Sequence, residues 1–248
     1  MAGDRVKLNT DTNLLKLIAM ITMLVDHLGA RVFPQYQVMR IIGRIAFPIY
    51  AYCVAVGCVY TRNIFKYALR MGVMAVLVQP LYATAMGHTP MMAFDWAHNF
   101  YRVDLIIEHY YLSKPSILFT LFAGILLLWT IRDKKYLLTG LLIAVIWYIQ
   151  NKLDYGLNGV LLILLFYVFC DRPLTSFAWV AAFMVWWGIP AIRTRIPDTM
   201  PATVSTQFFA LLSLPMIYFP LRTRMKINKY VYYGFYPAHL ALIYLLTM

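Results

Sequence analysis

Charged residues are scarce in this sequence. Only 13% of the 248 residues are charged and 62% are apolar, a balance that a soluble domain of this length would not need to cover its core. The formal net charge of +12 would suggest nucleic-acid binding in a soluble protein. Here, however, the lysines and arginines punctuate apolar runs and form no continuous patch. We therefore expect a membrane protein with no nucleic-acid partner.

Cysteines are few and the common catalytic motifs are missing. Cys53, Cys58 and Cys170 stand in apolar stretches, with neither the even count of a disulfide framework nor the spacing of a metal site. The chain has no G-x-S-x-G, no phosphate-binding glycine loop, no H-E-x-x-H and no G-x-G-x-x-G. These absences count against hydrolase, nucleotide-hydrolysing and metalloprotease functions. We interpret the cysteines as packing residues and predict no bound metal.

Apolar runs of the length needed to cross a bilayer, roughly 20 residues, are abundant. Nine segments qualify if shorter, tilted helices are accepted. They run approximately over Asn13–Phe33, Ile41–Thr61, Tyr67–Met86, Ser116–Ile131, Tyr136–Ile149, Gly156–Cys170, Leu174–Ile192, Ala202–Pro220 and Tyr230–Met248. The first has no convincing cleavage site and is expected to be an uncleaved span. The pattern predicts an all-α, polytopic membrane protein with about nine transmembrane helices in one domain over residues 1–248.

Loop charges predict the orientation of these spans. When the 22 lysines and arginines are assigned to alternating sides of the membrane, 14 fall on the amino-terminal side and 8 on the other. Because cytoplasmic loops carry the excess of positive charge, the amino terminus is expected in the cytoplasm. An odd number of spans then places Met248 outside the cell membrane.

One connection, Gly87 to Pro115, is too long for a simple turn and is expected on the outer side. Its aromatic content argues against disorder. Asp95 and His98 lie three residues apart within it, a spacing compatible with metal ligation, but no further ligand set has convincing spacing. Such long loops are usually functional or disordered, so a functional role is predicted here.

Two adjacent ionisable residues, Asp26 and His27, lie inside the first predicted span. Burying such groups costs a few kcal/mol or more, so they normally face a cavity or a partner. Adjacent helical residues do not face each other, and Arg44, three residues into the second span, is a candidate partner for Asp26. His27 would then be a general base, because imidazole titrates near neutral pH. The alternative is an Asp-Arg-His cluster that only locks helices together.

Other polar residues have two interpretations each. Arg62, Lys66 and Arg70 are spaced by four on the predicted cytoplasmic side, where they could bind the phosphates of a cosubstrate or mark topology beside anionic lipid headgroups. His239 lies near mid-depth of the last span, as a second site residue or as a histidine satisfied by a neighbouring helix. Asp154 opens the sixth span, where it could simply cap the helix.

Six segments of the chain carry these motifs. They are LKLIAMITMLVDHLGA (15–30), RIIGRIAFPIYAY (40–52), FDWAHN (94–99), ILFTLFAG (117–124), DYGLNGVLLILLFY (154–167) and KYVYYGFYPAHLALIYLL (229–246). Together, and in this order, they resemble the TraX family of membrane acyltransferases, named for the pilin amino-terminal acetylation protein. TraX proteins resemble a broader superfamily of transmembrane acyltransferases, which use cytoplasmic acyl-CoA to acylate acceptors at or across the membrane.

The resemblance implies an enzyme with acetyl-CoA as cosubstrate and a peptide, glycan or small molecule as acceptor. It implies that Asp26 and His27 belong to the active site. The further motif positions that would line it are Arg44, Asp95, His98, Asp154 and His239. The nucleotide end of acetyl-CoA would dock at Arg62, Lys66 and Arg70. A direct transfer and an acetyl-His27 intermediate both fit.

One departure from the family pattern concerns the acceptor. Residues 101–116 intervene between Asn99 and Ile117, whereas relatives run almost directly from the FDW-H-N motif into the next span. The insertion lies where an acceptor would approach, which suggests a substrate different from pilin.

The main rival function is a proton-coupled transporter or flippase using Asp26, His27 and His239, although the inverted repeats expected of it are absent. A structural partner in a secretion or pilus complex is the third possibility.

Overall fold

The structure is a computed structural model in which most of the chain can be described. The described residues are 12–87, 94–95, 100–101, 107–112, 114–188, 206–219, 223 and 225–248. Apart from one two-stranded ribbon, the regular structure of these residues is helical, which confirms the predicted helical fold class. They form two compact units, Met1–Arg62 with Leu161–Lys229 and Asn63–Val160 with Tyr230–Met248, each described by itself. The grouping of residues 1–248 into one domain stays a prediction.

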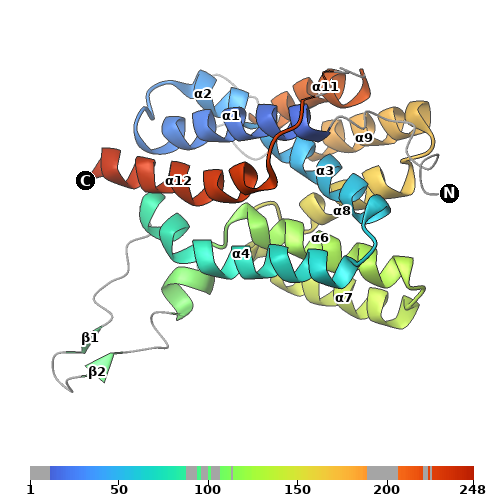
Figure 1. Ribbon diagram of the computed structural model, residues 1–248, viewed down its shortest axis with the longest axis horizontal. Helices are drawn as coiled ribbons and strands as arrows, with labels where there is room; N and C mark the ends of the chain where they lie inside the picture. Colours follow the sequence, from blue (N-terminus) through green and yellow to red (C-terminus); the bar gives the residue numbers. More distant parts are fainter. Residues whose placement is uncertain are drawn as a thin grey trace, which may run out of the picture. The chain divides into compact units, whose positions relative to one another are not determined.

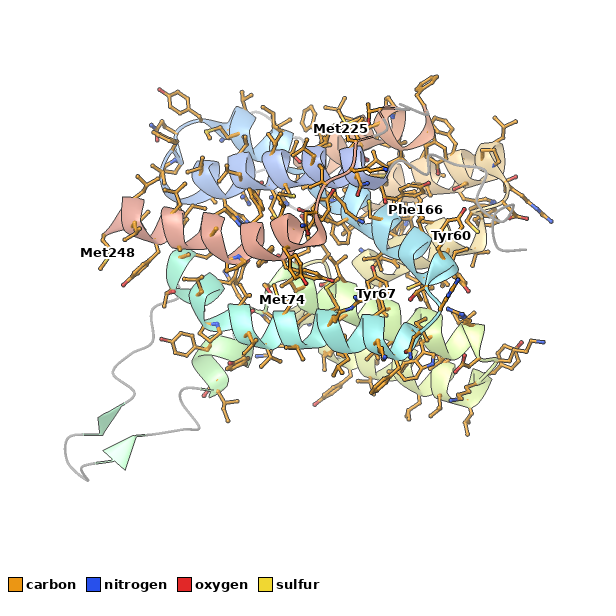
Figure 2. The ribbon with its side chains drawn as sticks, viewed as in Figure 1. Tyr60, Tyr67, Met74, Phe166, Met225 and Met248 are labelled. Atoms are coloured by element: carbon orange, nitrogen blue, oxygen red, sulfur yellow. The ribbon has the colours of Figure 1, made fainter. Side chains whose placement is uncertain are left out.

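The first unit is built on an amino-terminal helical hairpin. Helix α1 (Thr12–Arg31) packs against α2 (Gln37–Gly43) and against α3 (Ala46–Tyr60), as Figure 1 shows. At the start of α1, the Asn13 side chain donates a 3.0 Å hydrogen bond to the main-chain oxygen of Met225, which Figure 2 labels. This bond ties a segment from the end of the unit to its first helix.

Four further helices complete the first unit. These are the larger part of α8 (Gly156–Val168), α9 (Pro173–Gly188), the 3₁₀ helix η3 (Thr206–Ser213) and the short α11 (Leu214–Tyr218). Phe166 of α8 (Figure 2) meets Tyr52 of α3 edge-on, with ring centroids 5.4 Å apart, and both side chains are fully buried. Aromatic packing therefore joins α8 to α3 in the core of this unit.

The second unit contains α4 (Ile64–Ala85), α6 (Ile117–Arg132) and α7 (Tyr136–Ile149), which lie side by side in Figure 1. It also holds the short helices η1 and η2, the start of α8, helix α12 and the strands β1 and β2. Their bounds are Glu108–Leu112 for η1, Gln150–Lys152 for η2, Lys229–Thr247 for α12, Phe94–Asp95 for β1 and Phe100–Tyr101 for β2. The two strands pair antiparallel.

Each of the nine predicted spans contains helix among its described residues. Three helices are long and apolar enough to cross a membrane, Thr12–Arg31, Gln37–Tyr60 and Ile64–Ala85, and they match the first three predicted spans. Shorter apolar helices run over Ile117–Arg132, Gly156–Val168 and Gln207–Tyr218. The chain therefore has membrane-spanning character, while the total of nine crossings stays a prediction.

Candidate functional site

Helices α1 and α2 approach each other closely because two glycines lie between them. A Cβ atom added at Gly29 would come within 2.6 Å of the Met39 Cβ atom. One added at Gly43 would come within 2.1 Å of Asp26 Oδ1. Both distances are far below van der Waals contact, so residues with a side chain could not pack here without displacing a neighbour. Gly43 thus leaves the space that the Asp26 carboxylate occupies, and Gly29 lets α1 approach Met39.

The Asp26 carboxylate is held by two arginines. Arg44 belongs to the second predicted span, and Arg40 precedes that span. Arg40 Nη1 lies 2.5 Å from Asp26 Oδ2, and Arg44 Nη2 lies 3.1 Å from Oδ1. The same Nη1 also donates to the main-chain oxygen of Asp26 at 3.1 Å. The side chains of Asp26 and Arg44 are 13% and 15% exposed, so this cluster is largely removed from solvent. Charged hydrogen bonds in such surroundings are strong.

The Asp26–Arg44 ion pair predicted from the sequence is confirmed, and Arg40 is a partner that the sequence reasoning missed. The predicted second span began at Ile41, which left Arg40 among the outer loop charges. In the structure the apolar stretch begins at Gln37, and Arg40 on α2 and Arg44 directly after its end lie four residues apart on one face. The i, i+4 spacing of the two arginines was the signal that could have revealed Arg40.

His27 follows Asp26 on α1 and is buried, with 8% of its surface exposed. Successive residues of a helix are about 100° apart around its axis, so His27 does not share the face that meets α2. Helix geometry therefore predicts separate surroundings for the Asp26 and His27 side chains. The assignment of His27 as a general base stays a prediction.

The predicted basic stripe is only partly helical. Helix α4 begins at Ile64, and the Asn63 side chain caps it by accepting a 2.8 Å hydrogen bond from the main-chain nitrogen of Lys66. Arg62 therefore precedes the helix, and only Lys66 and Arg70 have the expected one-turn spacing along it. All three side chains are exposed, as binding to a cosubstrate or to lipid headgroups requires.

His239 lies in the second unit, buried on α12. Its Nδ1 is 2.9 Å from the main-chain oxygen of Phe235, one turn earlier on the same helix. Because a carbonyl can only accept, Nδ1 carries the proton in this contact, and Nε2 of the neutral ring has the lone pair. The ring also stacks on Phe235, with centroids 4.9 Å apart, and meets Tyr236 edge-on. His239 is thus held in one orientation by its own helix.

The remaining predicted substrate residues belong to the second unit or lie outside the described residues. Asp95 is in β1, opposite Phe100 of β2. Asp154 is exposed and lies two residues before α8, which begins at Gly156. His98 lies outside the described residues. Among the residues that are described, no group of three or more His, Cys, Asp or Glu side chains could hold a metal ion.

Gln79 is a second residue that the sequence reasoning missed. Its buried amide on α4 donates to the main-chain oxygens of Tyr110 at 2.7 Å and of Lys114 at 3.1 Å. Its Oε1 accepts from the main-chain nitrogen of Ser116 at 2.8 Å. One side chain therefore fastens the end of the long inserted connection to α4. A glutamine in the interior of a mainly apolar span was the signal of this role.

Comparisons with known proteins identify relatives of the chain. A probable fimbrial assembly protein, FimC of serogroup H1, from Dichelobacter nodosus is 28% identical over 241 residues, which cover 92% of each chain. An uncharacterized protein of Rickettsia prowazekii (strain Madrid E) is 48% identical over 40 residues, 16% of each chain. No solved structure matches the chain. The TraX protein family matches residues 11–247, nearly the whole sequence, and the chain therefore belongs to this family.

Proposed function

We propose that this protein is a membrane acyltransferase that moves an acetyl group from cytoplasmic acetyl-CoA to an amine or hydroxyl acceptor at or across the membrane. The observation that carries the proposal is the Asp26–Arg40–Arg44 cluster, held within the membrane-spanning hairpin next to the buried His27. Ionisable groups are rarely retained in such a place without a function. Membership of the TraX family and the similarity to a probable fimbrial assembly protein also support the proposal.

His27 is the proposed general base. It would take the proton from the acceptor nitrogen or oxygen as that atom attacks the thioester carbonyl. The carbon–sulfur bond then breaks, and the CoA thiolate receives the proton, so the products are the acetylated acceptor and CoA. An acetyl-His27 intermediate would split the same exchange into two steps. In either route the two arginines on Asp26 position α1, and with it His27.

The location of His27 fits an acceptor on the outer side. Helix α1 begins at Thr12, and His27 lies roughly 20 Å along it, in the outer half of a hydrocarbon core about 30 Å thick if the amino terminus is cytoplasmic. Acetyl-CoA would dock its nucleotide end at Arg62, Lys66 and Arg70 and extend its pantetheine arm inward. Asp95, His98, Asp154 and His239 are proposed to contact the acceptor, a peptide, glycan or small molecule other than pilin.

A transfer assay tests the proposal. The purified full chain in lipid nanodiscs is incubated with radiolabelled acetyl-CoA and a panel of amine and hydroxyl acceptors. We expect His27→Ala to lower transfer by about 100-fold or more, the usual contribution of a general base. Transfer by His27→Ala that equals the wild-type rate, in a variant with an unchanged unfolding temperature, would remove His27 from the mechanism.

A binding assay tests the cosubstrate site. Lys66→Gln combined with Arg70→Gln should weaken acetyl-CoA binding, because two cations that pair with its phosphates are lost. Lys134→Gln with Lys135→Gln removes two exposed lysines from the α6–α7 turn, on the same predicted side, and serves as the matched control. Equal binding by both double variants would reject the assignment. Absence of any acetyl-CoA binding to the wild type would favour transport instead.

The geometry of Asp26 argues against the rival transporter. Both carboxylate oxygens accept from guanidinium groups, so a proton relay through Asp26 would have to break two ion pairs in each cycle. Removing one partner of a buried ion pair is costly, about 3 kcal/mol or more. Asp26 is therefore better suited to a fixed, positioning role.

A further inference from the structure

Helices α4 and α6 lie side by side (Figure 1), but α6 begins short of the end of α4. Three contacts give their antiparallel register. They are the Phe65–Trp129 ring pair with centroids 5.9 Å apart, the Phe122 ring that an added Cβ at Gly72 would meet at 3.0 Å, and the 2.8 Å hydrogen bond from the Ser116 nitrogen to Gln79. Gln79 lies six residues before the end of α4 at Ala85, so α6 begins about 9 Å inside that end.

The start of α6 therefore lies within the membrane when α4 crosses it. Helix α4 has 22 residues, about 33 Å, against a hydrocarbon thickness of about 30 Å. Non-helical backbone at such a depth needs hydrogen-bond partners from the protein. Gln79 is the partner of three main-chain groups between Tyr110 and Ser116. The crossing that contains α6 is thus a broken helix.

A second contact joins the same segment to α4 at Pro80. Proline has no N–H, so the main-chain oxygen of Val76, four residues earlier, loses its helical partner. The Tyr111 hydroxyl donates a 3.3 Å hydrogen bond to this oxygen. The segment before α6 is therefore fastened to α4 at two places, which keeps the amino-terminal end of α6 at this depth.

Two buried hydroxyl groups lie at this end of α6. Ser116 is the N-cap residue, but its side chain makes no capping hydrogen bond. Thr120 lies one turn later on the same face, and its Cβ tilts towards the start of the helix. Both residues are 0% exposed, and among the residues that the structure describes neither hydroxyl has a hydrogen-bond partner. Because unpaired buried hydroxyls are costly, a bound group that pairs with both would stabilise the protein.

Thr120 differs in this respect from other threonines of the chain. The hydroxyls of five helical threonines donate to carbonyl groups of their own helix. These are Thr22, Thr84, Thr130, Thr139 and Thr247. The Thr120 hydroxyl makes no such bond, so it remains available to a ligand.

The backbone adds donors and a positive potential at the same place. The first N–H groups of a helix have no partner within it. That of Phe119 donates to the Ser116 oxygen at 3.0 Å, which leaves those of Ile117 and Leu118 as donors in this described part of α6. The helix dipole adds about half a positive charge. N–H groups only donate, so the site favours a ligand that accepts hydrogen bonds and carries negative charge.

Burial and charge limit the size and valence of this ligand. Residues 115–118 and Thr120 are all buried, which suits a small ion. The helix end supplies only about half a charge, which suits one negative charge better than the two of a phosphate dianion. Broken membrane helices present their amino-terminal ends to anionic groups in the same way.

We propose that the amino-terminal end of α6, with the Ser116 and Thr120 hydroxyls, binds a small monovalent anion of the size of chloride or acetate. The site belongs to the second unit and does not depend on the proposed acyl transfer. The bound anion accepts hydrogen bonds from the two hydroxyls and from the first N–H groups of the helix.

Thermal unfolding of the full chain in phosphatidylcholine nanodiscs tests the site. Sodium chloride and sodium acetate are compared with sodium gluconate at equal ionic strength, because gluconate is too large for a small site. Above the dissociation constant, chloride and acetate should raise the unfolding temperature by roughly 3–5 °C for each tenfold rise in concentration. Acetamide, a neutral molecule of the shape of acetate, should not. An acetamide effect equal to that of acetate would overturn the anion assignment.

A double variant, Ser116→Ala with Thr120→Val, removes both hydroxyls. It should need at least about tenfold more anion for the same temperature shift, because hydrogen bonds to a charged ligand are lost. Thr84→Val removes a hydroxyl that bonds within its own helix, and as the control it should respond like the wild type. An equal response of the double variant and the wild type would reject the site, as would a wild type that responds to neither anion.

Stability in gluconate separates binding from folding. There the double variant should unfold at or above the wild-type temperature, because its two hydroxyls have no partner to lose within the described residues. A clear loss of stability in gluconate would mean that the hydroxyls bond within the protein, and the site would be wrong. Anion binding without any acetyl transfer would leave this site in place and reject the acyltransferase proposal.

Discussion

Gly43 has a hydrogen atom where any other residue would place a carbon 2.1 Å from Asp26 Oδ1. Its backbone does not need a positive φ, so the requirement for glycine is steric. We expect Gly43→Ala to lower the free energy of unfolding by about 1–3 kcal/mol, the usual cost of overpacking, and to weaken the Asp26 ion pairs. Thermal unfolding in detergent measures the change.

Gly140 provides the matched control for this substitution. It lies within helix α7, and an added Cβ atom would meet no atom within 4 Å. Gly140→Ala should therefore stabilise the protein slightly, by about 0.5–1 kcal/mol, because alanine favours the helix. A Gly43→Ala variant as stable as Gly140→Ala would show that α1 and α2 do not approach closely.

Asp26 should contribute more to stability than either of its arginines. Asp26→Asn leaves two guanidinium groups without a carboxylate, and we expect a loss of about 3 kcal/mol. Arg44→Gln leaves Asp26 paired with Arg40, so a loss of about 1–2 kcal/mol is expected. The two variants and their double mutant are compared by thermal unfolding. An Arg44→Gln variant less stable than Asp26→Asn would contradict the two-arginine arrangement.

At the scale of single elements, Gln79 fastens the inserted connection to helix α4. Replacing it by leucine removes the partners of two carbonyl groups and one amide at a buried place. We expect a loss of about 2–4 kcal/mol in the free energy of unfolding, because buried groups left unpaired are costly. Hydrogen exchange should also accelerate at the amides of residues 110–116, which identifies the loosened segment.

Thr84 is the matched control for Gln79, because it is another polar residue of α4. Its hydroxyl donates to Pro80 and Leu81 within its own helix and does not hold the inserted connection. Thr84→Val should therefore leave hydrogen exchange at residues 110–116 unchanged. Equal exchange in Gln79→Leu and Thr84→Val would show that other contacts anchor the connection.

Sequence patterns predicted the helices better than their junctions. Hydropathy located the apolar runs because burial in lipid requires them, and it placed Asp26 and Arg44 within about two helical turns of each other in depth. It could not locate Arg40 on α2, because the helix begins in a polar hairpin where hydropathy gives no signal. Nor could it identify Gln79, since its partners are backbone atoms about 30 residues later. The contacts of Gln79 depend on tertiary packing and leave no spacing in the sequence, whereas Arg40 could have been found from its i, i+4 spacing to Arg44.

At the scale of the whole molecule, the number of membrane crossings depends on whether the short helices span the bilayer. Helix α7 has 14 residues, about 21 Å at 1.5 Å per residue, less than the hydrocarbon thickness of about 30 Å. Yet its apolar side chains are widely exposed, with Leu137 at 89%, and water would be an unfavourable surrounding for them. Lys134 and Lys135 precede the helix, and Lys152 follows it. We therefore expect α7 to cross with local thinning of the bilayer.

Reporter fusions test this topology together with the position of the carboxyl terminus. Alkaline phosphatase, which is active only outside the cytoplasm, is fused after Lys134, after Lys152 and after Met248. The charge distribution predicts an inactive fusion at Lys134 and active fusions at the other two. Equal activity at Lys134 and Lys152 would mean that α7 does not cross, and an inactive fusion at Met248 would mean an even number of crossings.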